Sequence, residues 1–547
     1  MRLSRRDAMK LGGLGALGAV GLAIPLGDLV SGSTASLLPS KNLPVPYQTV
    51  FSRLPVLPTV GSRVDQDTGQ TIDQYDVAAT TGAVSLVAGF PKTPVLGYEG
   101  LVPARRINAE VGTPIELRMH NRLPATHPTF GTPMNLSTHL HGSASLPQYD
   151  GYASDITRPG QVKTYHYPSI QTARTLWYHD HGVHYTAQNV YSGLASQYHL
   201  HDDMERALLP QGEFDVGLTL SDIMFQANAA ELYDDRTHSG LWGDVILVNG
   251  KPWPVMKVKK RIYRFRVLNA SPSRSYRPTL STGTPVYMVA TDGGLMPVSR
   301  PVAQWRHGTA ERYEILIDFS KFNTGQRIEL LNLSNPNNRN FTNTGKIMAF
   351  DVIDDPFDRN DPTAFSVPNT LNPGNEAMML KELPGMKVRS IRLEHNDVTN
   401  VWNLNGQTWA DVIASGFNSV LANPGLGDTE VWELENTSDG WFHPLHIHLI
   451  DAQILSRNGR PPFDYERGPK DVFYVGEKEK LRLIMKFGSR DPSSPFSVQK
   501  GKYMIHCHNL VHEDHDMMNQ FSVGLPAGAV DVNDPVMADP AYADPTP

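Results

Sequence analysis

The most restrictive feature of the sequence is the tripeptide His506-Cys507-His508, which contains the only cysteine of the 547-residue chain. The apolar run at 503–505 directly before it is typical of a β-strand. Successive side chains of a strand point to opposite faces of the sheet, so Cys507 is expected to face away from both histidines. One short segment can then contribute to two metal sites, joined by a few covalent bonds.

The rest of the chain has the composition and patterning of a β-rich globular protein. Hydrophobic residues make up 40%, enough for buried cores, and 45 glycines with 42 prolines indicate many turns. No long stretch has helical periodicity, and short alternating segments recur between turn residues. We therefore expect an all-β fold. The net charge of −7 argues against a nucleic-acid partner, which needs a basic stripe.

A pattern that occurs three times indicates three related domains. Alternating segments end in asparagine at Asn121, Asn269 and Asn436, spaced at roughly the length of one domain. Alternating strands bounded by turns are typical of β-sandwiches, so we predict three β-sandwich domains. The predicted segments are a first domain at 42–203, a second at 209–355, an interdomain linker at 356–386, a third domain at 387–526 and a flexible acidic tail at 527–547.

The N-terminus resembles a twin-arginine export signal. Arg5 and Arg6 are followed by Lys10 and by a Gly/Ala/Leu-rich run at 11–26. Residues 1–35 are thus predicted to be a signal peptide recognised by the twin-arginine export machinery. A membrane anchor is the alternative, although the run is short and rich in glycine. The mature protein is expected to be extracellular, periplasmic or in the cell envelope, without a stable membrane span.

Half of the 20 histidines fall in four clusters. The clusters are His139 with His141, His179 with His181, His443 with His446 and His448, and His506 with His508 and His512. Two clusters lie in the predicted first domain and two in the third, whereas the second has only His238 and His307, which form no pair. A His-x-His pair on a strand points both imidazoles to one side. One pair alone is an ordinary structural feature, but four clusters predict a multinuclear metal site where the first and third domains meet.

The residues around Cys507 indicate copper. Imidazole binds zinc, copper, iron and nickel, but structural zinc sites often use several cysteines. Here one cysteine lies near His512 and Met517, and His443 is the best candidate for a second histidine because the other histidines of its cluster form a pair. Two histidines, a cysteine and a long axial methionine are the ligands of blue-copper electron-transfer sites. An inert buried cysteine is the alternative.

Taken together, the clusters resemble the copper signatures of the multicopper oxidase family, most closely those of its bilirubin oxidase and spore-coat laccase groups. The motifs are His139-Leu140-His141-Gly142-Ser143, Thr175-Leu176-Trp177-Tyr178-His179-Asp180-His181 and His506-Cys507-His508-Asn509-Leu510-Val511-His512-Glu513-Asp514-His515-Asp516-Met517-Met518. The resemblance implies three cupredoxin-like, Greek-key domains and four copper ions. The implied ligands are His443, Cys507, His512 and Met517 for type 1 copper, His139 and His446 for type 2, and His141, His179, His181, His448, His506 and His508 for the type 3 pair.

The resemblance also implies an enzyme that couples four one-electron oxidations of phenolic, aminophenolic or tetrapyrrole substrates to the reduction of O2 to two waters. Electrons would pass from Cys507 to the two flanking histidines. Glu513 and Asp150 match acidic positions that the family uses near the three-copper site, where a carboxylate relays protons or only orients a histidine. Trp441 is expected either to border the type 1 site or to be an ordinary core residue.

Three other functions share parts of this pattern. Cuprous-ion oxidases of the family carry methionine-rich insertions, whereas the 18 methionines here are scattered. Enzymes that couple aminophenols, as phenoxazinone synthase does, share all of the chemistry and stay an alternative. A non-enzymatic cell-division scaffold of the same fold lacks copper ligands, whereas every ligand position is filled here.

Overall fold

The computed structural model describes residues 35–66, 68–354, 366–488, 499–525 and Asp534. Most of their regular structure is β-strand, so the predicted all-β fold class is confirmed. The predicted signal peptide and the predicted tail lie outside the described residues, except for Ala35 and Asp534. Asp534 is buried and pairs with Lys502 at 2.9 Å, which differs from a loose terminus at that residue. No helix of the described residues is long and apolar enough to cross a membrane.

The first sandwich consists of two sheets that enclose one hydrophobic core. The strands of one sheet, in spatial order, are β1 (Gly61–Val64), β2 (Thr71–Val84), β5 (Ile115–Asn121) and β7 (Val162–Tyr167), with β3 (Thr93–Tyr98) paired to β2. The strands of the other are β4 (Ile107–Glu110), β9 (Ala195–His201), β8 (Arg174–Asp180) and β6 (Thr138–His141). This second sheet carries the His-x-His segments of the first two clusters.

The second sandwich follows in sequence and has its own core. One sheet contains β12 (Lys251–Pro252), β11 (Val245–Val248), β10 (Asp215–Ile223), β14 (Ile262–Asn269), β18 (Arg312–Asp318), β16 (Val286–Thr291) and β17 (Gly294–Val302). The other contains β13 (Val255–Lys259), β20 (Lys346–Ile353), β19 (Arg327–Asn332) and β15 (Pro278–Leu280).

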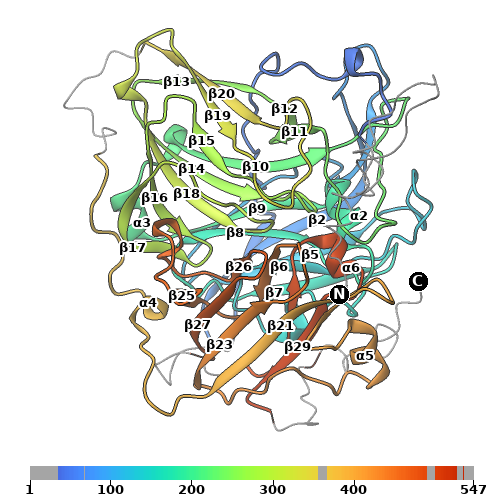
Figure 1. Ribbon diagram of the computed structural model, residues 1–547, viewed down its shortest axis with the longest axis vertical. Coiled ribbons are helices and arrows are strands. Elements are labelled where there is room, and N and C mark those ends of the chain that lie inside the picture. The colour runs from blue at the N-terminus through green and yellow to red at the C-terminus, as the bar shows by residue number, and fades with distance from the viewer. Residues whose placement is uncertain (1–34, 67, 355–365, 489–498, 526–533, 535–547) are drawn as a thin grey trace, which may run out of the picture.

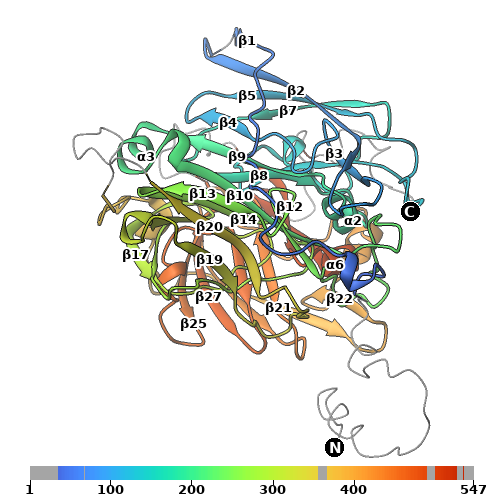
Figure 2. The ribbon, with the colours of Figure 1, turned by 90° about the horizontal axis from the view of Figure 1, so that it is seen from above.

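The third sandwich carries the remaining two histidine clusters around a further core. Its first sheet contains β22 (Val401–Leu404), β21 (Val388–Asn396), β23 (Thr429–Asn436), β27 (Lys480–Lys486) and β25 (Ala452–Arg457). Its second contains β26 (Val472–Val475), β24 (His443–Ile447), β28 (Gly501–Cys507) and β29 (Met518–Val523). In Figure 1 the green and yellow strands of the second sandwich lie above the orange and red strands of the third, and Figure 2 shows the blue and cyan strands of the first along one side of both.

The helices of the described residues are short and connect the strands. The α-helices are α2 (Thr186–Tyr191), α3 (Asp203–Leu208), α4 (Glu376–Met379), α5 (Trp409–Ala414) and α6 (Leu510–Asp514). The 3-10 turns are η2 (Ser40–Asn42), η3 (Pro147–Tyr149), η4 (Gly212–Phe214), η5 (Phe319–Lys321) and η6 (Asp464–Glu466).

The three sandwiches repeat one arrangement around the asparagines that the sequence singled out. Asn121, Asn269 and Asn436 end β5, β14 and β23, and each of these strands has one parallel and one antiparallel neighbour. Each Oδ1 accepts a hydrogen bond from the backbone N–H two residues on, and each Nδ2 donates to backbone carbonyls of the loops that follow. The three-fold repeat is therefore a repeat of hydrogen bonding as well as of sequence.

The segments outside the sandwiches tie them together. The sequence predicts a first domain from residue 42, but the backbone at 47–51 pairs with the second sandwich, where Tyr47 N donates to Trp253 O and Phe51 N to Val255 O. The described part of the predicted linker runs along β17 and then contacts β27 through an ion pair between Glu376 and Lys486.

Candidate metal centre

Eight of the ten clustered histidines meet where the first and third sandwiches join, and all ten are buried. Strand register produces this meeting on each side. His139 lies opposite His179 in the pairing of β6 with β8, and His446 lies opposite His506 in the pairing of β24 with β28. Because opposed residues of antiparallel strands share a face of the sheet, each pair of strands offers a row of imidazoles to the other sandwich.

Eight imidazoles form one cluster, which includes three groups of donor atoms contributed by histidines alone. In each group the ligand atoms lie within 4.8 Å of one another. The groups are His141 with His179 and His508, His181 with His448 and His506, and His139 with His141 and His446. Each group takes histidines from both sandwiches, so the cluster exists only when the two are docked.

In nearly every imidazole of the cluster, one ring nitrogen contacts a hydrogen-bond acceptor and the other is left for a metal. The Nδ1–H groups of His139, His179 and His446 donate to the backbone oxygens of Asp150, Asp180 and Asp471, respectively. The Nε2 atoms of these three residues have no hydrogen-bond partner among the described residues. Buried nitrogens without partners are rare unless an ion binds them, so the cluster fits a metal.

Two carboxylates hold further imidazoles of the cluster. Asp150 lies 2.8 Å from His448 Nδ1, and Glu513 lies 2.8 Å from His506 Nδ1 and 3.3 Å from His181 Nδ1. These are ion-pair distances, although the Glu513 oxygens are not aligned for regular hydrogen bonds. Both carboxylates thereby leave the Nε2 atoms of their histidines facing one another, at 3.1 Å between His506 and His448.

His141 is oriented the other way round. Its Nε2 lies 3.2 Å from the Asp471 carboxylate, and its Nδ1 is the nitrogen without a partner. Its ring stacks on that of His446 at 3.6 Å between centroids. His141 therefore offers Nδ1 to a metal, whereas His139, His179 and His446 offer Nε2.

Burial sets the protonation of these groups. It lowers the pKa of His179 to about 3 and of His181 to about 4, and neighbouring imidazoles reinforce the effect on His179. Burial also raises the pKa of Asp150 well above its usual range. For Glu513, burial acts upward but the adjacent His506 and His181 lower the pKa overall. His179 and His181 are thus neutral at pH 7, which is the form of imidazole that binds metals.

Cys507 points to a second group of donors on the other side of its strand. Its Sγ lies 3.4 Å from His443 Nδ1 and 3.8 Å from His512 Nδ1, and these two nitrogens are 3.2 Å apart. The three residues form a fourth candidate metal group. Met517 is buried beside them, because its backbone oxygen accepts a hydrogen bond from Cys507 N. Burial raises the pKa of the Cys507 thiol, and a bound cation removes that cost.

In this second group too, the imidazole nitrogens that do not face the thiol make hydrogen bonds. His443 Nε2 donates to Ser438 Oγ at 2.7 Å, and Ser438 in turn donates to Asn436 Oδ1. His512 Nε2 donates at 3.0 Å to the backbone oxygen of Ser239, which belongs to the second sandwich. Both imidazoles therefore present Nδ1 to the thiol.

Tryptophans from two sandwiches cover this group. Trp402 stacks on His512 at 3.8 Å between centroids, and Trp441 meets His512 edge-on at 5.7 Å. Trp242 of the second sandwich stacks on Trp441 at 6.3 Å. Trp441 thus borders the group, as one of the two interpretations of the sequence expected.

Several of these contacts carry no signal in the sequence. Asp471 and Ser438 bind rear nitrogens from positions outside any motif, and Ser239 does so through its backbone. His238, unpaired in the sequence, stacks on His515 at 3.5 Å beside this site. Only the burial of Asp471 and its contact with His141 identify its role, and neither can be derived from spacing along the chain.

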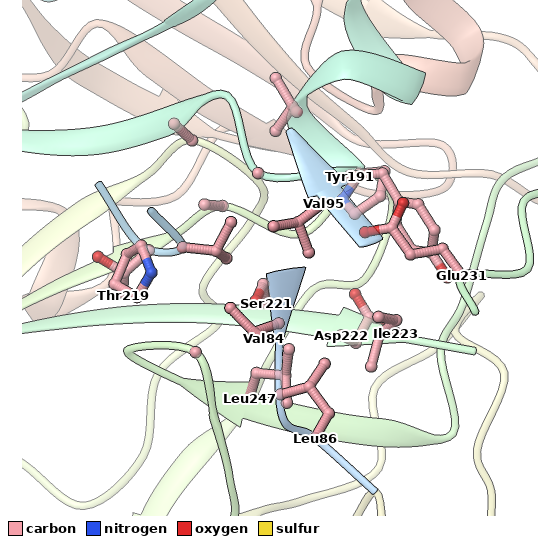
Figure 3. A pocket seen from close by; sticks show the side chains of 18 residues that line it. Val84, Leu86, Val95, Tyr191, Thr219, Ser221, Asp222, Ile223, Glu231 and Leu247 are labelled. Carbon is pink, nitrogen blue, oxygen red and sulfur yellow. The ribbon is translucent and has the colours of Figure 1, made fainter. Parts of the chain in front are cut away.

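A cavity of about 40 Å³ lies apart from these groups, between the first and second sandwiches (Figure 3). None of the ten histidines lines it, and side chains such as Val95 and Leu247 form much of its wall. Glu231 lies at its edge and accepts a hydrogen bond from Ser192 Oγ at 2.7 Å. Burial raises the pKa of Glu231 to about 8. The space suits one or two water molecules.

Comparison with known proteins agrees with this geometry. Residues 79–205 and 389–526 match family models described as multicopper oxidase. These segments contain all four histidine clusters. The chain is 38% identical over 472 residues to the bilirubin oxidase of Albifimbria verrucaria, with 83% of this chain and 77% of that protein covered. It is 30% identical over 505 residues to the laccase of Bacillus subtilis, with coverage of 83% and 94%.

Solved structures have the same fold. The McoA multicopper oxidase of Aquifex aeolicus superposes with a TM-score of 0.73 at 26% identity, covering 88% of this chain and all of that one. A laccase from Pediococcus acidilactici gives 0.71 at 25% identity, covering 90% and 99%.

Proposed function

The chain belongs to the multicopper oxidase family, and on that premise we propose how its residues divide among the copper ions and which donors it oxidises. As a member of the family it is a copper-dependent oxidoreductase that uses O2 as electron acceptor. The observation that carries the proposal is the convergence of eight buried imidazoles in one cluster and of two more beside the Cys507 thiol; several nitrogens of the cluster have no hydrogen-bond partner among the described residues.

We propose four copper ions in three kinds of site. His443, Cys507 and His512, together with Met517, would hold type 1 copper. His139 and His446 would hold type 2 copper. The type 3 pair would be held by His141, His179 and His508 on one side and by His181, His448 and His506 on the other. Each assignment is supported by one of the four donor groups.

When bound, the copper ions supply one-electron chemistry with organic donors and four-electron reduction of O2 to two waters. The chain's own part is to hold the Cys507 group and the eight-histidine cluster a fixed distance apart. Cys507 is covalently adjacent to His506 and His508, so a few bonds join the thiol to two imidazoles of the cluster. The buried surroundings exclude water from both sites, which keeps the ligand geometry fixed.

Glu513 and Asp150 act, in this proposal, as orienting residues. Each fixes the rear nitrogen of at least one imidazole of the cluster, as metal-binding histidines require. The proton relay inferred for both from the sequence stays a prediction. If it operates, Glu513→Gln and Asp150→Asn change the pH profile of O2 uptake even in molecules that retain full copper. An unchanged profile in such molecules would leave only the orienting role.

The donors proposed are phenols, aminophenols and tetrapyrroles. The relatives named bilirubin oxidase and laccase support this class. The half-buried ring of Trp441 beside the type 1 group also supports it, because flat aromatic donors stack on such surfaces. Cuprous-ion oxidation and aminophenol coupling for pigment synthesis stay as alternatives for the same site.

The experiment is a comparison of wild type with Cys507→Ser. The wild-type protein should contain four copper ions per chain, absorb in the blue region and consume O2 with a phenolic donor. The variant should lose the blue band and the oxidation of donors while keeping the copper of the eight-histidine cluster. A copper-free wild type would refute the proposal. A panel of bilirubin, a phenol, an aminophenol and Cu(I) then identifies the donor.

We also propose that the protein leaves the cytoplasm by the twin-arginine route, which transports folded proteins and so permits copper insertion beforehand. The support is the Arg5-Arg6 pair and the short apolar run behind it. Replacing both arginines by lysine should retain the protein in the cytoplasmic fraction. Normal export of that variant would contradict the route.

A further inference from the structure

The second sandwich has none of the ten histidines, yet one of its arginines reaches the edge of the metal centre. Arg312 begins β18 and is fully buried. Its guanidinium makes a bidentate contact with the Asp471 carboxylate, with hydrogen bonds from Nη1 at 2.7 Å and from Nη2 at 2.5 Å. Bidentate, charge-assisted pairs of an arginine and a carboxylate are strong and directional.

The remaining donors of Arg312 are also used. Its Nε donates at 3.0 Å to the backbone oxygen of Thr175, on the strand that carries His179. Its Nη2 donates to Asp292 O at 3.1 Å, and its backbone N–H donates to Asp292 Oδ1 at 2.7 Å. A single guanidinium therefore bonds to the first, second and third sandwiches. This number of fixed contacts leaves the side chain one geometry.

Asp471, fixed in this way, in turn contacts two imidazoles of the cluster. Its carboxylate lies 3.2 Å from His141 Nε2, and its backbone oxygen accepts the Nδ1–H of His446 at 2.9 Å. These are the two rings that stack at 3.6 Å between centroids, and they come from different sandwiches. The contact at Nε2 is also what leaves Nδ1 of His141 without a hydrogen-bond partner among the described residues, whereas in His139, His179 and His446 the nitrogen without a partner is Nε2.

The chain next to His141 is shaped for this pair. Gly142 adopts a φ of +88°, and a Cβ at that position would lie 2.5 Å from Arg312 Nη2 and 2.8 Å from Asp471 Oδ2. A side chain is therefore excluded by both the backbone conformation and the ion pair. The backbone of the first His-x-His segment thus runs directly against the Arg312–Asp471 pair.

We propose that Arg312 is a positioning residue of the copper centre, which acts through Asp471 to fix the orientation of His141 and His446. The role rests on the proposed function, since these two histidines would hold type 2 copper and one type 3 copper. Loss of the bidentate contact frees the Asp471 carboxylate to rotate, and His141 then loses the acceptor that turns its Nδ1 inward. Such outer contacts change metal affinity by about 10–100-fold when removed.

The test uses Arg312→Lys with Arg274→Lys as its matched control. Arg274 is another fully buried arginine of the second sandwich, bonded to the Asp222 carboxylate at 2.9 Å and to two backbone oxygens. None of these partners contacts the ten histidines in the bonds described above. Lysine keeps the positive charge at either position but cannot make a bidentate contact with a carboxylate.

Copper per chain, the electron paramagnetic resonance signal of type 2 copper and the blue absorbance are measured on the purified holoenzymes. Arg312→Lys should alter the type 2 signal and weaken copper retention against a chelator by about 10–100-fold, with the blue band intact. Arg274→Lys should leave the type 2 signal as in wild type. If Arg312→Lys has a wild-type signal and retains its copper, or if both variants change the signal equally, the proposal is wrong.

A second variant serves if Arg312→Lys does not fold. Asp471→Asn keeps the size of the side chain but removes the charge that Arg312 grips, and it should give the same altered type 2 signal. A wild-type signal from this variant would overturn the proposal. Failure of the proposed function itself looks different, because the wild-type protein would then have no copper signal to alter.

Discussion

Replacing Asn436 by alanine should damage the third sandwich and the type 1 site together. Asn436 is buried, and its Nδ2 donates to Trp441 O at 2.7 Å and to Gly476 O at 3.0 Å. Its Oδ1 accepts from the backbone N–H of Ser438 at 3.0 Å and from its hydroxyl at 2.7 Å. The same Ser438 Oγ accepts the Nε2–H of His443 at 2.7 Å. One side chain therefore supports both a loop and a proposed ligand.

The magnitude follows from the groups that lose their partner. Alanine leaves Trp441 O, Gly476 O and Ser438 N–H without the bonds described, and each unsatisfied buried group costs about 1–3 kcal/mol. Because part of this loop is only half-buried, water restores some of these bonds, and a total of about 3–5 kcal/mol is expected. Release of Ser438 also removes the acceptor behind His443, which should weaken copper retention at the type 1 site by about 10–100-fold.

The repeat supplies its own controls. Asn121 and Asn269 make the corresponding bonds in the other two sandwiches, where the bonded loops contain no type 1 ligand. Alanine at each of the three positions should lower the guanidinium midpoint of the copper-free chain by similar amounts. Only Asn436→Ala should alter the blue absorbance of the holoenzyme. Equal effects on the blue band from all three variants, or none from Asn436→Ala, would refute the reasoning.

Two further predictions concern single groups. Met517→Leu should raise the reduction potential of type 1 copper, because a weak axial donor stabilises Cu(II) and leucine provides none; a lower potential in redox titration would count against Met517 as a ligand. Glu231, whose pKa burial raises to about 8, contributes stability that is present below its ordinary pKa and is lost as pH rises through 8. Glu231→Gln should therefore gain stability relative to wild type as pH increases from 5 to 8, and a difference in denaturation midpoint that fails to widen would contradict this.

The parts of the site that the sequence predicts are those with a fixed period. Alternation along a strand assigns Cys507 and its flanking histidines to opposite sides, and the structure has Cys507 near His443 and His506 near His448 on the other side. The repeat of asparagine-terminated strands likewise predicts three related sandwiches. Both inferences need only the two-residue period of a strand and the spacing of a domain.

The residues that orient the proposed ligands by hydrogen bonds do not recur with such a period in the sequence. Asp150, Asp180 and Asp471 hold histidines through backbone oxygens, which every residue has, so residue type gives no signal. Ser239 does the same from another sandwich. The sequence also does not predict that residues 47–51 pair with the second sandwich, because backbone pairing at an edge does not require a particular residue type. Tertiary docking, which no local pattern encodes, decides all of these.

In the proposed site the second sandwich is needed, because the proposed ligands come from two sandwiches that must dock with little freedom. Donor atoms within 4.8 Å of one another, contributed by two sandwiches, lose their arrangement if either sandwich shifts by about 1 Å. Contacts from the second sandwich restrict that shift at both sites. Ser239 O holds His512, Thr309 Oγ1 donates to His508 O, and Arg312 bonds to both partner sandwiches. Substitutions at these contacts should therefore release copper under conditions in which the three separate cores are still folded.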